Sequence, residues 1–89
     1  MSNRIEFFCY ENDKPLEIQL EPEAIIFIAS PGNSIAFHAV NCSDDFRWSV
    51  RVEHENVGVQ LFPDSLYDYE IEIYENDVRL DDVYKYMKQ

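Results

Sequence analysis

Eighty-nine residues, of which 46% are hydrophobic and 15% aromatic, make one folded domain spanning residues 1–89 and are too apolar for a disordered chain. Eighteen acidic residues against seven basic ones give a formal net charge of −11. This charge argues against direct binding to nucleic acid or to an anionic membrane, because both depend on Lys and Arg. The longest apolar run, residues 24–29, is too short to span a bilayer, and the first residues lack an apolar signal segment, so we expect a cytoplasmic protein.

Apolar and polar residues alternate with a period of two along most of the chain, which predicts half-buried strands rather than helices. The expected strands are residues 4–10, 16–20, 24–29, 35–40, 46–53, 57–62 and 67–73. Residues 24–29 and 35–40 are apolar on both faces, apart from His38, which predicts that something covers both faces. We expect a helix at the C-terminal end of the chain to cover one face, and a dimer interface is the alternative.

The segment at residues 46–53 alternates most regularly. Its apolar residues are expected to face the core and its polar residues the solvent. The expected inward residues are Phe46, Trp48, Val50 and Val52, and the expected outward residues are Arg47, Ser49 and Arg51.

Turn-forming residues separate these segments. Residues 11–15 and 30–34 predict hairpin connections. Residues 10–16 (YENDKPL) resemble residues 74–80 (YENDVRL). We attribute the resemblance to two hairpins that use similar turn chemistry, because Asn and Asp tolerate the left-handed backbone that tight turns require.

The chain as a whole therefore reads as all-β and mainly antiparallel. Its spacing predicts a small β-sandwich or barrel of about 7–8 short strands connected by hairpins. The C-terminal end departs from this pattern, because its apolar residues follow i, i+3, i+4, i+7 spacing with acids before bases, which predicts a short helix. The apolar residues of this helix are Leu80, Val83, Tyr84 and Met87.

The sequence contains no recognisable catalytic or metal-binding motif. Its two glycines are too few for a phosphate-binding loop, and His38 and His54 lack metal-ligand spacing. Cys9 and Cys42 are expected to be reduced thiols, with Cys9 packed in the core and Cys42 more exposed. We therefore expect no enzymatic activity, no cofactor and no metal.

The main candidate for function is the acidic segment near the C-terminus, where tyrosines and isoleucines alternate with carboxylates. Such a surface suits electrostatically steered binding to a basic protein, with tyrosines as apolar anchors. A face that only keeps the protein soluble is the alternative. The expected partner-binding residues are Tyr67, Asp68, Tyr69, Glu70, Glu72, Tyr74, Glu75, Asp77, Asp81 and Asp82.

This pattern predicts a small acidic protein-binding inhibitor, of the kind represented by immunity proteins, antitoxins and phage anti-defence proteins. Its partner would be a basic toxin, nuclease or defence effector, whose phosphate-binding cleft the carboxylates occlude by mimicking phosphates. The alternative is a β-sandwich adaptor or self-assembling structural domain that forms a homodimer through residues 24–29 and 35–40.

Overall fold

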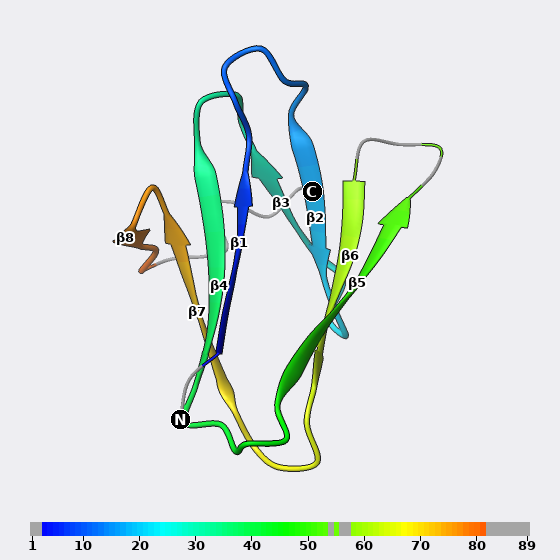
Figure 1. Ribbon diagram of the computed structural model, residues 1–89, viewed down its shortest axis with the longest axis vertical. Coiled ribbons are helices and arrows are strands. Elements are labelled where there is room, and N and C mark those ends of the chain that lie inside the picture. The colour runs from blue at the N-terminus through cyan, green and yellow to red at the C-terminus, as the bar shows by residue number, and fades with distance from the viewer. Residues whose placement is uncertain (1–2, 54, 56–57, 82–89) are drawn as a thin grey trace.

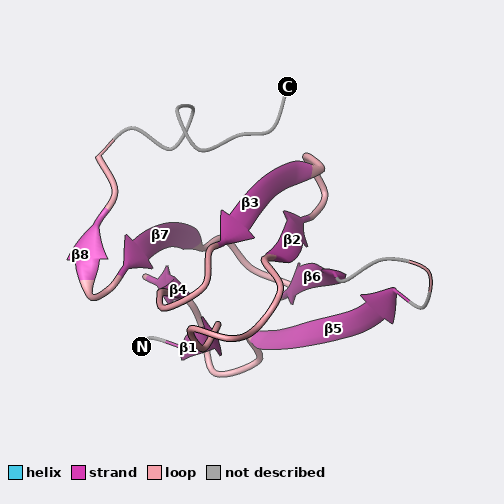
Figure 2. Ribbon diagram, turned by 90° about the horizontal axis from the view of Figure 1, so that it is seen from above, coloured by secondary structure: helices cyan, strands magenta, loops and turns pink. Residues whose placement is uncertain are grey.

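The computed structural model describes residues 3–53, 55 and 58–81 and shows two four-stranded β-sheets packed face to face (Figure 1, Figure 2). The first sheet has the strand order β1-β4-β7-β8 and the second has the order β3-β2-β6-β5. The strands are β1 (Asn3–Phe8), β2 (Leu16–Leu20), β3 (Ile25–Ala29), β4 (Ser34–Val40), β5 (Arg47–Glu53), β6 (Gly58–Asp64), β7 (Glu70–Glu75) and β8 (Val78–Arg79). The all-β expectation is confirmed for these residues.

The described residues contain no α-helix, and therefore none that could cross a membrane. The expected C-terminal helix falls mainly on residues 82–89, which lie outside the described part of the chain. Leu80, its first apolar residue, is described. The backbone N–H of Leu80 donates to the carbonyl oxygen of Ile73 over 2.8 Å, and its side chain packs against the core.

The core lies between the two sheets, where the period-two alternation places one set of side chains from each strand. Its centre is Phe37 of β4, whose ring meets those of Phe27, Phe7 and Trp48 edge-on at centroid distances of 5.4, 6.1 and 6.4 Å. Ile18 of β2 is also fully buried. Burying one such side chain stabilises the fold by about 1.5–3 kcal/mol.

The connections differ from the hairpins expected at residues 11–15 and 30–34. Both of these segments carry the chain from one sheet to the other, because β1 and β4 belong to the first sheet and β2 and β3 to the second. Consecutive strands form hairpins at β2–β3, β5–β6 and β7–β8 instead, while β2 and β6 run parallel. Turn residues mark where the chain reverses, but they do not determine which sheet the next strand joins.

The two segments that share the letters YEND form different turns. In residues 74–80, Asn76 and Asp77 have φ angles of 51° and 66°, and they form the two-residue turn between β7 and β8. In residues 10–16 the Asp13 carboxylate accepts the backbone N–H of Tyr10 over 2.9 Å, and neither Asn12 nor Asp13 has a positive φ. The left-handed interpretation is therefore confirmed for the second segment and wrong for the first.

The two segments that are apolar on both faces take different positions. Strand β4 lies between β1 and β7, and its outward Ala36 is buried between the register positions of Glu6 and Tyr74. Strand β3 lies at the edge of the second sheet, and its outward Ile26 and Ile28 are half-buried. Strand β4 is thus flanked on both sides by strands of its own sheet, whereas the C-terminal helix expected to cover one face falls mainly outside the described residues.

Strand β5 differs from the prediction at two of the residues that were expected to face the core. Trp48 faces the core, and its indole N–H donates to the carbonyl oxygen of Asn3 over 3.4 Å, which joins the two sheets at this end. Val50 and Val52 are 44% and 59% exposed, so the expectation that they face the core is wrong. Figure 2 shows the reason: β5 begins beside β1 and then runs away from the first sheet.

Cys42 also differs from expectation. It was expected to be exposed because it lies in a polar stretch, but it is buried in a small second cluster with Ala39 and Phe46. Its thiol donates to the carbonyl oxygen of Ala39. Cys9 is buried as expected, and neither Cys9 nor Cys42 forms a disulfide.

Candidate protein-binding surface

Two highly exposed apolar side chains, Leu66 and Tyr67, lie on the connection between β6 and β7, here called the Leu66 loop (residues 65–68). Leu66 is 88% exposed and Tyr67 is 66% exposed. This loop lies at the lower end of the molecule in Figure 1, beside the connection between β4 and β5. Large apolar side chains exposed this far favour contact with another molecule over a role in the core.

Asp45, from the connection between β4 and β5, holds the Leu66 loop in place. Its carboxylate accepts the backbone N–H of Leu66 over 2.6 Å and the hydroxyl of Ser65 over 3.0 Å. The Ser65 hydroxyl oxygen in turn accepts the backbone N–H of Tyr67 over 3.2 Å, and Ser43 donates its hydroxyl to Asp45. The loop is therefore ordered before any partner arrives, which lowers the entropy cost of binding.

These hydrogen bonds also affect the charge on Asp45. The pKa of its carboxyl group lies below the ordinary value of 3.8, chiefly because the carboxylate accepts the N–H of Leu66 and then the hydroxyl of Ser43. Asp45 is thus ionised at neutral pH and adds negative charge next to the backbone of the Leu66 loop.

Further carboxylates surround the loop. Asp44, Asp64, Asp68 and Glu70 are all exposed. Asp64 pairs with the Arg47 guanidinium over 3.2 Å, and Glu70 accepts the side-chain amide of Asn41 over 2.9 Å. The surface therefore combines two exposed apolar side chains with exposed carboxylates, of which Asp64 is paired with Arg47. In such an arrangement the apolar side chains anchor a partner and the flanking charges select it.

Tyr69 plays a different part from Tyr67. Its ring lies edge-on to Phe46 at a centroid distance of 5.2 Å, and it packs against the second core cluster. Tyr69 therefore anchors the end of the Leu66 loop to the core and offers a partner less surface than Tyr67 does.

The next part of the expected binding segment is engaged within the chain. Glu72 pairs with Arg79 over 3.3 Å and accepts the phenol of Tyr74 over 3.0 Å. That hydrogen bond, more than desolvation, raises the pKa of Tyr74 above 10.0. The charge of Glu72 is thus largely matched by Arg79.

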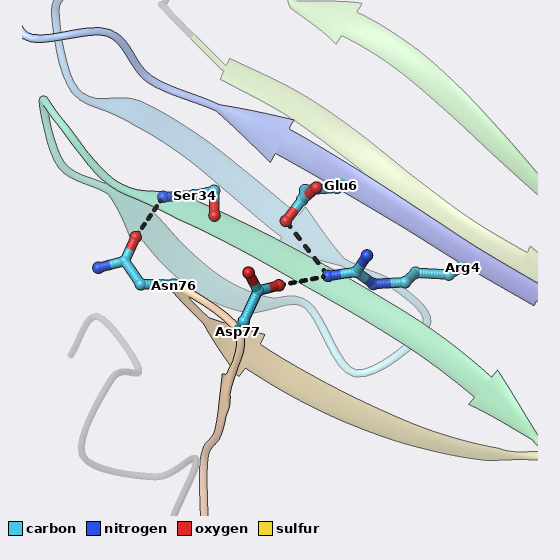
Figure 3. Close-up of polar contacts among 5 residues, drawn as sticks. All are labelled: Arg4, Glu6, Ser34, Asn76 and Asp77. Atoms are coloured by element: carbon cyan, nitrogen blue, oxygen red, sulfur yellow. Dashed lines mark hydrogen bonds and ion pairs between the residues drawn. The ribbon is translucent and has the colours of Figure 1, made fainter.

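Asp77 is also paired within the chain. Arg4 of β1 bridges the carboxylates of Asp77 and Glu6 over 3.0 and 3.2 Å (Figure 3). Beside this bridge, the Asn76 side chain accepts the backbone N–H of Ser34 over 3.0 Å, tying the β7–β8 turn to the start of β4. This end of β7 is held by interactions within the chain.

The expected site therefore divides in two along β7. Tyr67, Asp68 and Glu70 lie at or beside the Leu66 loop, whereas Glu72, Tyr74 and Asp77 take part in pairs on the outer face of the first sheet. Glu75 is half-buried beside β4 and Asp81 is exposed. Asp82 lies outside the described residues.

Leu66 and Asp45 are the functional candidates that sequence reasoning missed. Leu66 could have been noticed in the sequence, because it alternates with Tyr67, Tyr69 and Ile71. It therefore stands at a position in the alternation that is otherwise occupied by acidic residues. The role of Asp45 could hardly be predicted from the sequence, because Leu66, whose backbone N–H it accepts, is 21 residues away.

Among the described residues, no three His, Cys, Asp or Glu side chains are placed to hold a metal ion together. Comparison with known proteins found no matching family model, no similar curated protein and no similar solved structure. The Leu66 loop with its surrounding acids is therefore the candidate site, chosen on its geometry and charge.

Proposed function

We propose that this protein is a small acidic inhibitor that binds a basic protein through the Leu66 loop and covers the partner's positively charged functional surface. The observation that carries this proposal is the exposure of Leu66 and Tyr67 on a loop whose backbone Asp45 and Ser65 hold by hydrogen bonds. Leu66 and Tyr67 supply the apolar anchors, and tyrosine is among the residues that dominate binding energy at interfaces.

The acids around the loop determine the kind of partner. Asp44, Asp68 and Glu70 pair with Arg and Lys side chains that otherwise bind phosphate groups, while the net charge of −11 speeds the encounter. The proposed partner is therefore a basic toxin, nuclease or defence effector. Inhibition follows because two molecules cannot occupy one surface, and no chemical step is needed.

Three immobilised forms of the chain test this proposal: the wild type, the double variant Leu66→Ala/Tyr67→Ala, and the control Val78→Ala. Val78 is 66% exposed, like Tyr67, but it follows the turn at the other end of β7. The wild type and the control should retain the same basic protein from a lysate of the source cell, and the double variant should lose it.

The retained protein is then purified and its affinity and activity are measured with each form. The double variant should bind at least about thirtyfold more weakly, since an interface anchor contributes about 2 kcal/mol or more. Asp68→Lys/Glu70→Lys should slow association and reduce its dependence on salt. Equal binding by the double variant, or a partner whose activity is unchanged in the complex, contradicts the proposal.

A further inference from the structure

Strand β5 forms a long open edge of the second sheet. Among the described residues it pairs with β6 on one side and with no strand on the other. It has seven residues, five of them exposed, and it contains no proline. Soluble proteins usually protect such an edge by shortening it, by placing proline in it or by pairing it.

The inward face of this edge is apolar, and beyond Trp48 its side chains are exposed. Trp48 is held at the start of the strand by its hydrogen bond to Asn3, but beyond it the two sheets diverge, leaving Val50 and Val52 exposed (Figure 1). Val52 lies opposite the half-buried Val59 of β6, so the apolar surface continues onto the neighbouring strand. Contact with another strand would remove this surface from water.

We propose that two copies of the chain pair antiparallel through β5, with Val50 of one copy opposite Val50 of the other. In this register Arg47 of each copy lies opposite Glu53 of the other copy, so two such charge pairs form on the outer face of the joined sheet. On the inner face the same register places Trp48 opposite Val52. Opposite charges and paired apolar side chains across neighbouring strands both stabilise a sheet.

The charges on β5 also exclude the neighbouring registers. If the two-fold axis passed through Ser49, Arg47 would lie opposite Arg51 of the second copy, twice. If it passed through Arg51, the two Arg51 side chains would face each other. Like charges directly opposite destabilise a sheet, so of these three neighbouring registers only the one centred on Val50 is complementary in charge. It also pairs all seven residues of β5.

The existing contact of Arg47 allows the pairing. Arg47 already bonds Asp64 over 3.2 Å, but its side chain is largely exposed, and a guanidinium has five donors to share between two carboxylates. The pairing does not rest on the proposed inhibitor function, because Leu66 and Tyr67 lie outside β5. Arg47 nevertheless lines one surface hollow together with Asp64 and Leu66, so the pairing is measured by self-association and not by binding to the basic partner.

Charge exchange tests the register. Sedimentation equilibrium of the full chain should show a dimer of the 10.6 kDa protomer that dissociates on dilution. Arg47→Glu and Glu53→Arg should each weaken the dimer by about tenfold or more, because each places like charges opposite one another twice. An equal mixture of the two variants should dimerise again, because a mixed pair restores both opposite-charge contacts.

Arg79→Glu controls for the change in net charge, since Arg79 is an exposed arginine on β8, in the other sheet. It should dimerise as the wild type does. A wild type that stays monomeric at high concentration, or a mixture of the two variants that behaves like either one alone, overturns the proposal.

Cysteine cross-linking gives a second, independent measurement. Facing residues in an antiparallel pair have Cα atoms about 4.5–5.5 Å apart, which suits a disulfide, so Val50→Cys should oxidise to a covalent dimer. Val52→Cys is the matched control, because the two copies of residue 52 would lie roughly 14 Å apart along the strands. The native Cys9 and Cys42 are buried and do not compete. Equal cross-linking of both variants overturns the register.

Discussion

The backbone N–H of Leu66 lies 2.6 Å from the carboxylate of Asp45, 21 residues away in the chain. The two residues belong to separate connections, one from β4 to β5 and the other from β6 to β7, and each connection passes from one sheet to the other. The bond therefore fastens two sheet crossings together at the end of the sandwich where Leu66 and Tyr67 are exposed.

Asp45→Asn should loosen the Leu66 loop while leaving the core intact. A neutral amide accepts hydrogen bonds more weakly than a carboxylate, so the backbone amide of Leu66 should exchange its hydrogen several-fold faster. Amide hydrogen exchange by NMR measures this, with Asp44→Asn as the control on the neighbouring exposed acid. Unchanged exchange at Leu66 in Asp45→Asn would show that other contacts hold the loop.

The pKa of Asp45 determines the pH range in which the Leu66 loop should loosen. Folding lowers the pKa of Asp45 below 3.8, so the stabilisation from its ionised form is complete above that pH and is lost as the pH falls through the folded-state pKa. The chemical shift of the Leu66 amide should therefore change with a midpoint below pH 3.8. Asp45→Asn should abolish this transition, and a midpoint at or above 3.8 in the wild type would contradict the assigned cause.

Leu66 and Tyr67 should contribute little to folding. Because both side chains are exposed, Leu66→Ala and Tyr67→Ala should change the free energy of unfolding by less than about 0.5 kcal/mol. Phe37→Ala, at the centre of the core, should cost about 3–5 kcal/mol. Urea denaturation followed by Trp48 fluorescence compares the three variants, and a large loss at Leu66 would indicate a structural role for the loop.

Tyr74 should ionise at higher pH than an ordinary tyrosine. Its neutral phenol donates to Glu72, so the stabilisation is complete below pH 10.0 and is lost as the pH rises through the raised folded-state pKa. Ultraviolet difference titration of the wild type against Tyr74→Phe isolates this group. Glu72→Gln should lower the midpoint toward 10.0, because it removes both the charge and the stronger acceptor.

The positions of most strands could be predicted from the sequence, because one buried face imposes a period of two wherever a strand packs on the core. Residues 16–20 became β2 without change, and β4 and β5 differ from expectation by one residue at one end. The pairing of strands could not be predicted this way. Alternation describes which face of a strand is apolar, and β1 has the same alternation whether it pairs with β2 or with β4.

The candidate surface was harder to predict, because exposure depends on what lies across from a residue. Val50 and Trp48 share one face of β5, but only Trp48 has the first sheet opposite it. The carboxylates of Glu72 and Asp77 look equivalent to that of Asp68 in the sequence. Their partners Arg79 and Arg4 come close only after β8 and β1 join the sheet.

The strand order also bears on how the chain folds as it is synthesised. The chain passes between the sheets four times: from β1 to β2, from β3 to β4, from β4 to β5 and from β6 to β7. The first sheet therefore combines β1 with β7 and β8, which are made much later. In the second sheet, β2 can form its parallel pairing with β6 only after β6 has been made. The second sheet has all its strands once β6, which ends at Asp64, has been made, whereas the first sheet still lacks β7 and β8 at that point. Cooperative folding of the two sheets together should therefore begin only after β7 has left the ribosome.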